Sequence, residues 1–542
     1  MVSALLLLAG CGGEWSLAGP EPVPTPAAEV SAKVDTGHLL TRLSLDLRGV
    51  RPSLDELAAV EADPALIDSY VDAYLQDPRF GERVRSLFAD RYLTRQDYWY
   101  VSASDYGLDD QPGFASAVGD EPLRILSTVA ELDLPYTDVV TADWTMANEV
   151  LGAAWPLDYP ADATGWRQVH YTDGRPAAGV LSSNGLWWRY MSSFSNANRA
   201  RANAVSRTFM CEDYLSKPIE FDRNVNILDG DALNDALQNN PGCAACHYSL
   251  DPLAAYMWGF FYYDYSSPAE TTSYHAERER LWDDYADGVA PGYYGEPGYT
   301  IADLGRQIAD DPRFVSCAVR QVWEGLLQRG QVIEDTESLL AHRAAFVDGG
   351  LTVRSLYRSV VSAPEYASVS VDDSRYATRK MISPDQLAAS IEDLTGFRFT
   401  YAGYDMLSTD TYGLRTLAGG VDGQFVTAPA ASPTATLVLV QERLAQGAAA
   451  YVLEADRADP ANARLFTEVN FSETPSTDRA AMARQIQSLH LRLFANHVAE
   501  DGPEVAANLD LWQELYDLEH DPVAAWAGVL TVLLRDPLFL VY

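Results

Sequence analysis

Apolar residues recur at helical spacing along most of the chain. The spacing i, i+3, i+4, i+7 predicts amphipathic helices, and it is clearest at residues 38–47, 53–75, 304–329, 383–396 and 482–498. Alternating apolar and polar positions are few. We expect short strands only at Val169–Tyr171 and Thr436–Val440. The pattern therefore predicts a mostly α fold, a multi-domain helical protein.

Several helix ends are marked by polar residues. Ser53 is followed three residues later by Glu56, which is the spacing of a capping box. Ser383 is followed by Pro384, which suits the first helical position, and by Gln386 at the third position. Both serines are therefore expected to be N-caps.

A short phrase with proline and an aromatic residue follows several of these helices. It reads DPRF at Asp77–Phe80 and Asp311–Phe314, APEY at Ala363–Tyr366 and DPLF at Asp536–Phe539. Proline cannot continue a helix but suits the first turn of the next. We expect the aromatic residue to pack back on the helix just ended, a purely structural role.

Length and composition are those of a globular protein with a real core. The chain has 542 residues, of which 47 % are hydrophobic, and this length suits about three or four domains. We expect helical domains at residues 32–150, 266–373 and 374–542, around a central domain at 151–265. With 39 basic and 77 acidic residues the net charge is −38, so a nucleic acid is an unfavourable partner.

The N-terminal segment has the features of an export signal. The apolar run Ala4–Ala9 leads into Leu8-Ala9-Gly10-Cys11, which resembles the lipobox of bacterial lipoproteins. The run is too short to span a bilayer; a buried helix is the alternative. We expect a signal peptide at residues 1–11, a lipid on Cys11 and a Pro-rich linker at 12–31. The protein would then be anchored to the bacterial cell envelope, facing the periplasm or cell exterior.

The remaining cysteines divide into two pairs. Cys243 and Cys246 stand three residues apart, which leaves Cys211 and Cys317. An even remainder in an oxidising compartment predicts a disulfide between Cys211 and Cys317. The alternative is two separate buried thiols.

The stretch NNPGCAACHYSLDP contains the most specific chemical signal. Cys243, Cys246 and His247 form a CxxCH motif, which is typical of c-type haem attachment through two thioethers, with the histidine as an axial iron ligand. On one helical turn the two sulfurs lie on the same face. Asp251-Pro252 is expected to cap and begin another helix.

Two other interpretations of the motif stay open. Cys243 and Cys246 could form a disulfide or redox pair, although the βαβ pattern of thioredoxin-like proteins is missing. Cys243, Cys246, His247 and Cys211 could instead bind structural zinc.

A second axial ligand is not fixed by the sequence. Met257 lies ten residues beyond His247 and is a candidate metal ligand, as are His170 and His275; an ordinary core role is the alternative for each. An open position would favour an oxidase or peroxidase. Five aromatic residues could wall a haem or simply pack in the core: Trp258, Phe260, Phe261, Tyr262 and Tyr263.

Several phrases resemble a known family. The segment Arg42–Leu57 reads RLSLDLRGVRPSLDEL, and it resembles the opening of planctomycete cytochrome-c-type domains of unknown function. The stretch AAGVLSSNGLWWRYMSSFSNANRARANAVSRTFMCEDYLSKP, followed by CAACHYSLDPLAAYMWGFF, resembles the companion domain. Related chains occur in planctomycetes and myxobacteria, many as lipoproteins or secreted proteins.

The resemblance supports the haem interpretation without implying an activity. It implies that Cys243, Cys246 and His247 are the haem motif and that Cys211 and Cys317 are recurrent cysteines. The chain departs from the family where GFALENFD is replaced by AAYMWGFF, which loses acidic residues and gains aromatic ones.

The combined expectation is an exported, lipid-anchored protein with one covalent haem c that transfers electrons to or from a redox partner protein. The alternatives are a haem-dependent oxidase or peroxidase, and a haem-free surface or scaffold lipoprotein in which the CxxC is a disulfide.

Overall fold

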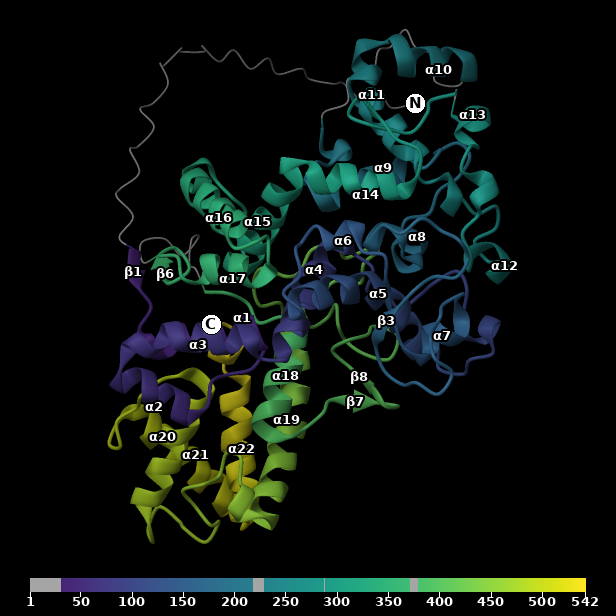
Figure 1. Cartoon of the computed structure of the whole chain (residues 1–542). Helices are drawn as coiled ribbons and strands as arrows, with labels where there is room; N and C mark the ends of the chain where they lie inside the picture. The colour runs from purple at the N-terminus through teal and green to yellow at the C-terminus, as the bar shows by residue number, and fades with distance from the viewer. Residues whose placement is uncertain (1–30, 218–228, 287, 371–378) are drawn as a thin grey trace, which may run out of the picture.

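The computed structural model describes residues 31–217, 229–286, 288–370 and 379–542. Within these residues the chain forms 22 α-helices and eight short strands, and the strands pair only as four two-stranded sheets. The mostly α fold expected from the sequence is confirmed (Figure 1).

The elements follow one another in chain order. The helices of the first third are α1 (Thr36–Arg48), α2 (Leu54–Ala62), α3 (Ile67–Gln76), α4 (Arg79–Tyr92), α5 (Gln111–Glu131), α6 (Asp138–Thr141), α7 (Glu149–Ala154) and α8 (Asn184–Arg189). Those of the middle are α9 (Arg199–Met210), α10 (Gly230–Asn239), α11 (Pro241–Ala255), α12 (Pro268–Thr271), α13 (Trp282–Tyr285), α14 (Ile301–Asp310), α15 (Pro312–Leu327), α16 (Thr336–Asp348) and α17 (Val353–Val361). The last are α18 (Pro384–Thr395), α19 (Ala435–Ala458), α20 (Arg479–Phe494), α21 (Pro503–Glu519) and α22 (Pro522–Arg535).

All four strand pairs are antiparallel. They are β1 (Ser31–Lys33) with β6 (Ser368–Ser370), β2 (Thr145–Ala147) with β3 (Arg167–Val169), β4 (Gly292–Tyr293) with β5 (Glu296–Pro297), and β7 (Thr400–Tyr401) with β8 (Tyr404–Asp405).

Of the two expected strand segments, one overlaps a strand and the other is wrong. β3 begins two residues earlier than the expected Val169–Tyr171 and overlaps it at Val169. The segment Thr436–Val440 instead opens helix α19, where Thr434 caps the helix by accepting a hydrogen bond from the Leu437 amide. Leu437, Val440 and Leu444 are buried on one side of α19, so helical spacing over a long stretch outweighs the β-branched composition of a short one.

The polar helix boundaries are confirmed. Ser53 with Glu56, and Ser383 with Gln386, form reciprocal capping boxes. The Asp311 side chain accepts a hydrogen bond from the Arg313 amide at the start of α15. The aromatic residue of each of the four phrases is 1 % exposed, so it packs in the core as expected: Phe80, Phe314, Tyr366 and Phe539.

Two hydrophobic cores organise the molecule. The first draws its buried residues from positions 40–366, together with Ala495. The second draws them from positions 381–540, together with Leu45. In Figure 1 the helices α19–α22 of the second core form the lower part of the molecule, and α10 and α11 lie at the opposite end. The domain boundaries expected from the sequence stay a prediction.

Helix α1 is shared by the two cores. Leu43 and Leu47 pack into the first core, whereas Leu45 packs into the second. The Gln386 side-chain amide donates to the Leu45 carbonyl at 2.9 Å, and the Ser390 hydroxyl donates to the Gly49 carbonyl at 3.2 Å. Helix α1, the first helix in the described part of the chain, therefore belongs structurally to both halves.

A buried ion pair lies at this junction. Asp46 and Lys380 are 5 % and 3 % exposed, and the ammonium group contacts the carboxylate directly. The same carboxylate accepts hydrogen bonds from Tyr366 at 2.5 Å and from Tyr542 at 2.8 Å. Lys380 also donates to the Leu326 carbonyl at 2.8 Å. Burial lowers the pKa of Lys380 to about 8, even though Asp46 opposes that shift.

Removing the cation should destabilise the whole fold. In Lys380→Met the Asp46 carboxylate stays buried without its counter-charge, so the free energy of unfolding should fall by about 3–5 kcal/mol. Urea denaturation followed by circular dichroism measures the change.

The chain offers a matched control for that experiment. Lys217 forms an ion pair with Glu212 but is 41 % exposed in its side chain, so Lys217→Met should cost less than about 1 kcal/mol. Equal losses of unfolding free energy in the two variants would contradict the structural role of the pair Asp46–Lys380.

Candidate functional site

The CxxCH motif lies in the first turns of α11. The Asn240 side chain accepts a hydrogen bond from the Gly242 amide, and Pro241 occupies the first helical position. Cys243, Cys246 and His247 therefore stand at positions i, i+3 and i+4, which share one side of a helix. The helix lies at the end of the molecule that is remote from α19–α22 (Figure 1).

The expectation that Asp251-Pro252 begins a second helix is wrong. α11 continues through both residues to Ala255, with Pro252 inside it. The helix tolerates the loss of one backbone hydrogen bond at the proline. The Asp251 side chain is engaged with two other side chains instead of capping a helix.

Asp251 joins His247 to α9. His247 Nδ1 lies 2.9 Å from Asp251 Oδ1. Arg199 makes a two-pronged ion pair with the same carboxylate, with distances of 2.7 Å from Nε to Oδ1 and 3.0 Å from Nη2 to Oδ2. Burial alone would raise the pKa of Asp251, but the hydrogen bonds from His247 and Arg199 outweigh it and lower that pKa. Asp251 is thus an ionised acceptor.

This contact fixes the tautomer of the imidazole. With Asp251 accepting at Nδ1, a neutral His247 carries its lone pair on Nε2. Among the described residues Nε2 has no hydrogen-bond partner, and the His247 side chain is 22 % exposed. Nε2 is therefore available as a metal ligand.

The two sulfurs of the motif are also available. Cys243 and Cys246 are free thiols, and both are partly exposed. Two unbonded thiols on one side of a helix, beside an imidazole with a free Nε2, are the donor set that covalent haem c requires. The residues present fit that group.

The candidates for a second axial ligand all have ordinary structural surroundings. Met257 is fully buried in the first core. His170 lies 3.1 Å from Asp158, and His275 Nε2 lies 2.8 Å from the Glu270 carbonyl. The second axial ligand stays a prediction.

The aromatic residues that follow α11 pack against other protein rings. The Trp258 and Phe261 rings lie 4.8 Å apart, and Phe260 packs against Tyr274 at 4.9 Å. Trp258, Phe260 and Phe261 are at most 1 % exposed, whereas Tyr263 is 53 % exposed. Core packing accounts for the buried members of this cluster.

The expected disulfide is confirmed. Cys211 and Cys317 are bonded and link the end of α9 to α15. The zinc alternative thereby loses Cys211 as its fourth ligand. Among the residues that the structure describes, no group of three or more His, Cys, Asp or Glu side chains is arranged to hold a metal ion.

The expected signal peptide, lipidation site and linker all lie near the N-terminus. Cys11 and nearly all of the linker lie outside the described residues. In the portion that is described, every helix is too short or too polar to cross a bilayer.

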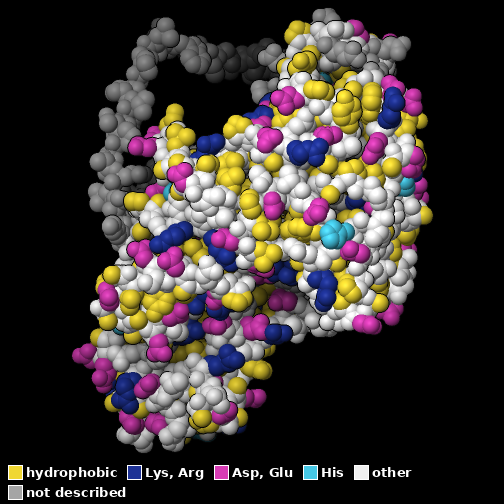
Figure 2. Space-filling view, in the orientation of Figure 1, with side chains coloured by type: hydrophobic (Ala, Val, Ile, Leu, Met, Phe, Trp, Pro, Cys, Tyr) yellow, Lys and Arg dark blue, Asp and Glu magenta, His cyan; other side chains and the backbone are white. Residues whose placement is uncertain are grey.

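The structure contains a second candidate site that the sequence did not indicate. A cavity of about 740 Å³ lies between the two cores. Its walls come from α4, the segment before α5, the start of α5, the end of α15, the start of α18 and the segment 403–431. Figure 2 shows the surface hollowed where the upper and lower parts of the molecule meet, with acidic and basic side chains around the hollow.

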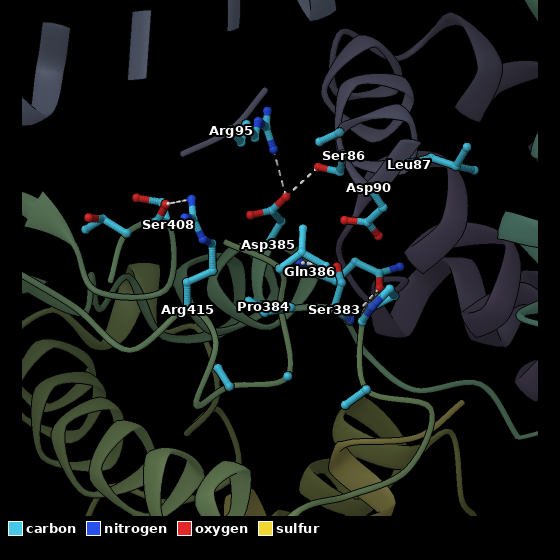
Figure 3. Close-up of a pocket in the computed structure, with 18 of the residues that line it drawn as sticks. Ser86, Leu87, Asp90, Arg95, Ser383, Pro384, Asp385, Gln386, Ser408 and Arg415 are labelled. Atoms are coloured by element: carbon cyan, nitrogen blue, oxygen red, sulfur yellow. Dashed lines mark hydrogen bonds and ion pairs between the residues drawn. The ribbon is translucent and has the colours of Figure 1, made fainter. Parts of the chain in front are cut away.

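Arg95 forms ion pairs with three carboxylates in the wall of this cavity. Arg95 contacts Asp120 at 2.8 Å, Asp385 at 3.1 Å and Glu82 at 3.2 Å. Asp385 also accepts a hydrogen bond from the Ser86 hydroxyl at 2.6 Å (Figure 3). The sequence indicated only a helix start at Ser383–Gln386, because Arg95 and Ser86 are 290 and 299 positions away from Asp385.

The state of the four cysteines can be checked chemically. In folded, haem-free protein, iodoacetamide should modify Cys243 and Cys246 because they are partly exposed thiols. Cys211 and Cys317 should react only after reduction and unfolding. Peptide mass spectrometry locates the adducts, and a disulfide-linked peptide holding Cys243 and Cys246 would contradict the assignment.

Comparison with known proteins found a similarity for one segment of the chain. A family model described as "PSCyt2: Protein of unknown function (DUF1549)" matches residues 25–108. This range includes Arg42–Leu57, the first phrase of the resemblance noted in the sequence. No curated protein and no solved structure matches the chain. The chain thus contains, near its N-terminus, a segment similar to a domain family of unknown function.

Proposed function

We propose that the protein is an exported, lipid-anchored c-type haem protein that takes part in electron transfer. The observation that carries the proposal is the arrangement on α11, where two free thiols stand beside an imidazole whose Nδ1 is held by a carboxylate. Cys243 and Cys246 would form the thioethers, and His247 Nε2 would bind the iron. When bound, the haem supplies a one-electron redox centre.

The contribution of the protein is to orient the ligand. Asp251 fixes the ring of His247 and its tautomer, and Arg199 holds Asp251 in place. Hydrogen bonds of this kind to a metal-ligating histidine set its orientation and raise its basicity. The attachment helix would therefore present a pre-oriented ligand.

The proposed location is supported by the disulfide. A bond between Cys211 and Cys317 is typical of proteins outside the cytosol, which agrees with a lipid on Cys11 and a position facing the periplasm or cell exterior. The haem-free scaffold alternative requires a Cys243–Cys246 disulfide, and the thiol state of both residues speaks against it.

A second candidate function is haem-dependent oxidation or peroxidation. The contact between the Asp251 carboxylate and His247 Nδ1 favours this second function. It makes the imidazole more basic, and a more basic axial ligand donates more electron density to iron. A six-coordinate low-spin spectrum of the loaded protein supports the electron carrier, and an open sixth position supports the oxidase or peroxidase.

The decisive experiment is a pyridine haemochrome spectrum of the full chain matured with the c-type machinery. Wild type should show covalent haem at one per chain, and Cys243→Ala/Cys246→Ala should lose it completely. The Cys211→Ala/Cys317→Ala variant is the matched control: it also lacks two cysteines but keeps the motif, so it should retain the spectrum. A colourless wild type, or a spectrum unchanged in the motif variant, would refute covalent attachment.

A further inference from the structure

A surface groove with exposed apolar side chains lies beside the Cys211–Cys317 disulfide, and we call it the disulfide groove. Its volume is about 530 Å³, and its walls come from the end of α9, from α15, from the segment 331–333 and from α16. Ile333, Leu340 and Val332 line it and are 84 %, 61 % and 54 % exposed. Apolar side chains that gather on an exposed surface mark a contact site, so the groove suits a partner segment with apolar side chains.

The charge of the groove is opposite to that of the chain. The net charge of the protein is −38, yet the described residues that line the groove include no Asp or Glu and three arginines: Arg313, Arg320 and Arg343.

The arginines of the groove differ in how they are paired. Arg313 pairs with Asp311 at 2.6 Å. Arg320 pairs with Glu324 at 2.9 Å, and neither carboxylate lines the groove. Within the described part of the chain, Arg343 contacts only the Ser316 hydroxyl, at 3.1 Å. The groove therefore favours a segment in which carboxylates accompany apolar residues.

Residues 12–30, which precede the described part of the chain, have this composition. They include Glu14, Glu21 and Glu29 and contain no Lys or Arg. Trp15 and Leu17 supply large apolar side chains directly after the first glutamate. Four prolines between positions 20 and 26 restrict the backbone, which reduces the conformational entropy lost when such a segment binds.

The described chain begins close to α16, which forms one wall of the groove. Ser31 pairs with Ser370 in the sheet of β1 and β6. Glu365, five residues before Ser370, contacts His342 on α16 at 3.3 Å, and Figure 1 shows β1 and β6 on the same side of the molecule as α16 and α17. Sixteen residues lead from Trp15 to Ser31, and at about 3.1 Å per residue they can reach about 50 Å. Because α16 has 13 residues and is about 20 Å long, the segment can reach the groove.

We propose that residues 14–23 of this chain bind in the disulfide groove. Trp15 and Leu17 cover the exposed apolar residues of α16 and of the segment before it, and the glutamates face the arginines. This docking depends on neither haem nor lipid. With the proposed lipid on Cys11, four residues before Trp15, it would turn this face of the molecule toward the membrane.

Photocrosslinking in the purified full chain tests the proposal. Benzoylphenylalanine in place of Trp15 bonds on irradiation to side chains within its reach, and peptide mass spectrometry locates the bond. Most of the product should join position 15 to residues that line the groove of the same chain. Leu340→Asp/Arg343→Glu should lower the yield of this product about tenfold or more, because it removes an apolar contact and reverses a charge.

An exposed leucine and arginine on another helix provide the matched control. Leu439 is 63 % exposed and Arg443 is exposed; they lie about one turn apart on α19 and outside the groove. Leu439→Asp/Arg443→Glu should therefore leave the yield of the groove crosslink unchanged.

A variant in the segment itself tests the role of charge. Glu14→Gln/Glu21→Gln/Glu29→Gln should lower the crosslink yield about threefold or more and should make it insensitive to salt. This variant changes none of the described residues, so it separates docking from folding, and thermal melts identify any groove variant that is unfolded.

Three outcomes would overturn the proposal. They are crosslinks spread over the surface without preference for the groove, a groove crosslink of equal yield in folded Leu340→Asp/Arg343→Glu, and groove crosslinks that form only between two chains, which would make a second copy the occupant.

Discussion

The buried contact between Asp46 and Lys380 is the constraint on which the two-core arrangement depends. A carboxylate and an ammonium group are costly to remove from water unless they pair and their remaining hydrogen-bonding capacity is satisfied. Here the hydroxyls of Tyr366 and Tyr542 donate hydrogen bonds to the Asp46 carboxylate. The Lys380 ammonium group donates another to the Leu326 carbonyl. The contact can form only when α1, the end of α15 and the last residue of the chain are in place together. Asp46 and Tyr542 also line the cavity, so the same network that joins the cores shapes one wall of it.

Helix α9 plays a comparable role at the other end of the molecule. Its first residue, Arg199, holds Asp251 on α11, and Cys211, directly after its last turn, is bonded to α15. Arg201, which is fully buried, donates to the carbonyls of Phe260 and Tyr190. α9 is thereby held in its first turn and at its C-terminal end. Through the Asp251 carboxylate it links His247 to the first core.

Local signals in the sequence were sufficient for much of the fold. The capping boxes at Ser53 and Ser383 and the proline phrases act over three or four residues, so they can be recognised in the sequence. The segment Thr436–Val440 is helical because the apolar spacing continues beyond it, through α19 to Ala458. The error at Asp251 has a different cause: an aspartate before a proline is a good cap, but here His247, four positions earlier, and Arg199, 52 positions away, engage its side chain instead.

The candidate sites likewise differ in whether their residues are close together in the sequence. The CxxCH motif is contiguous, so it was visible in the sequence, although its orienting partners were not. The cavity brings together Gln96, Asp90 and Asp385 from separate segments, and each has an unremarkable sequence context. The cavity forms only where these segments meet in the folded protein, so no pattern along the chain could have indicated it.

The double membership of α1 has a practical consequence for dividing the protein. A cut between residues 366 and 380 would separate nearly all residues of the two cores. It would leave Leu45 and the Gly49 carbonyl, which contact the second core and α18, on the N-terminal fragment. The C-terminal piece would expose the groove that receives them, and the N-terminal piece would carry Asp46 without its cation. Neither fragment is expected to fold alone, whereas the two mixed together should complement each other, so in folding terms the halves form one cooperative unit.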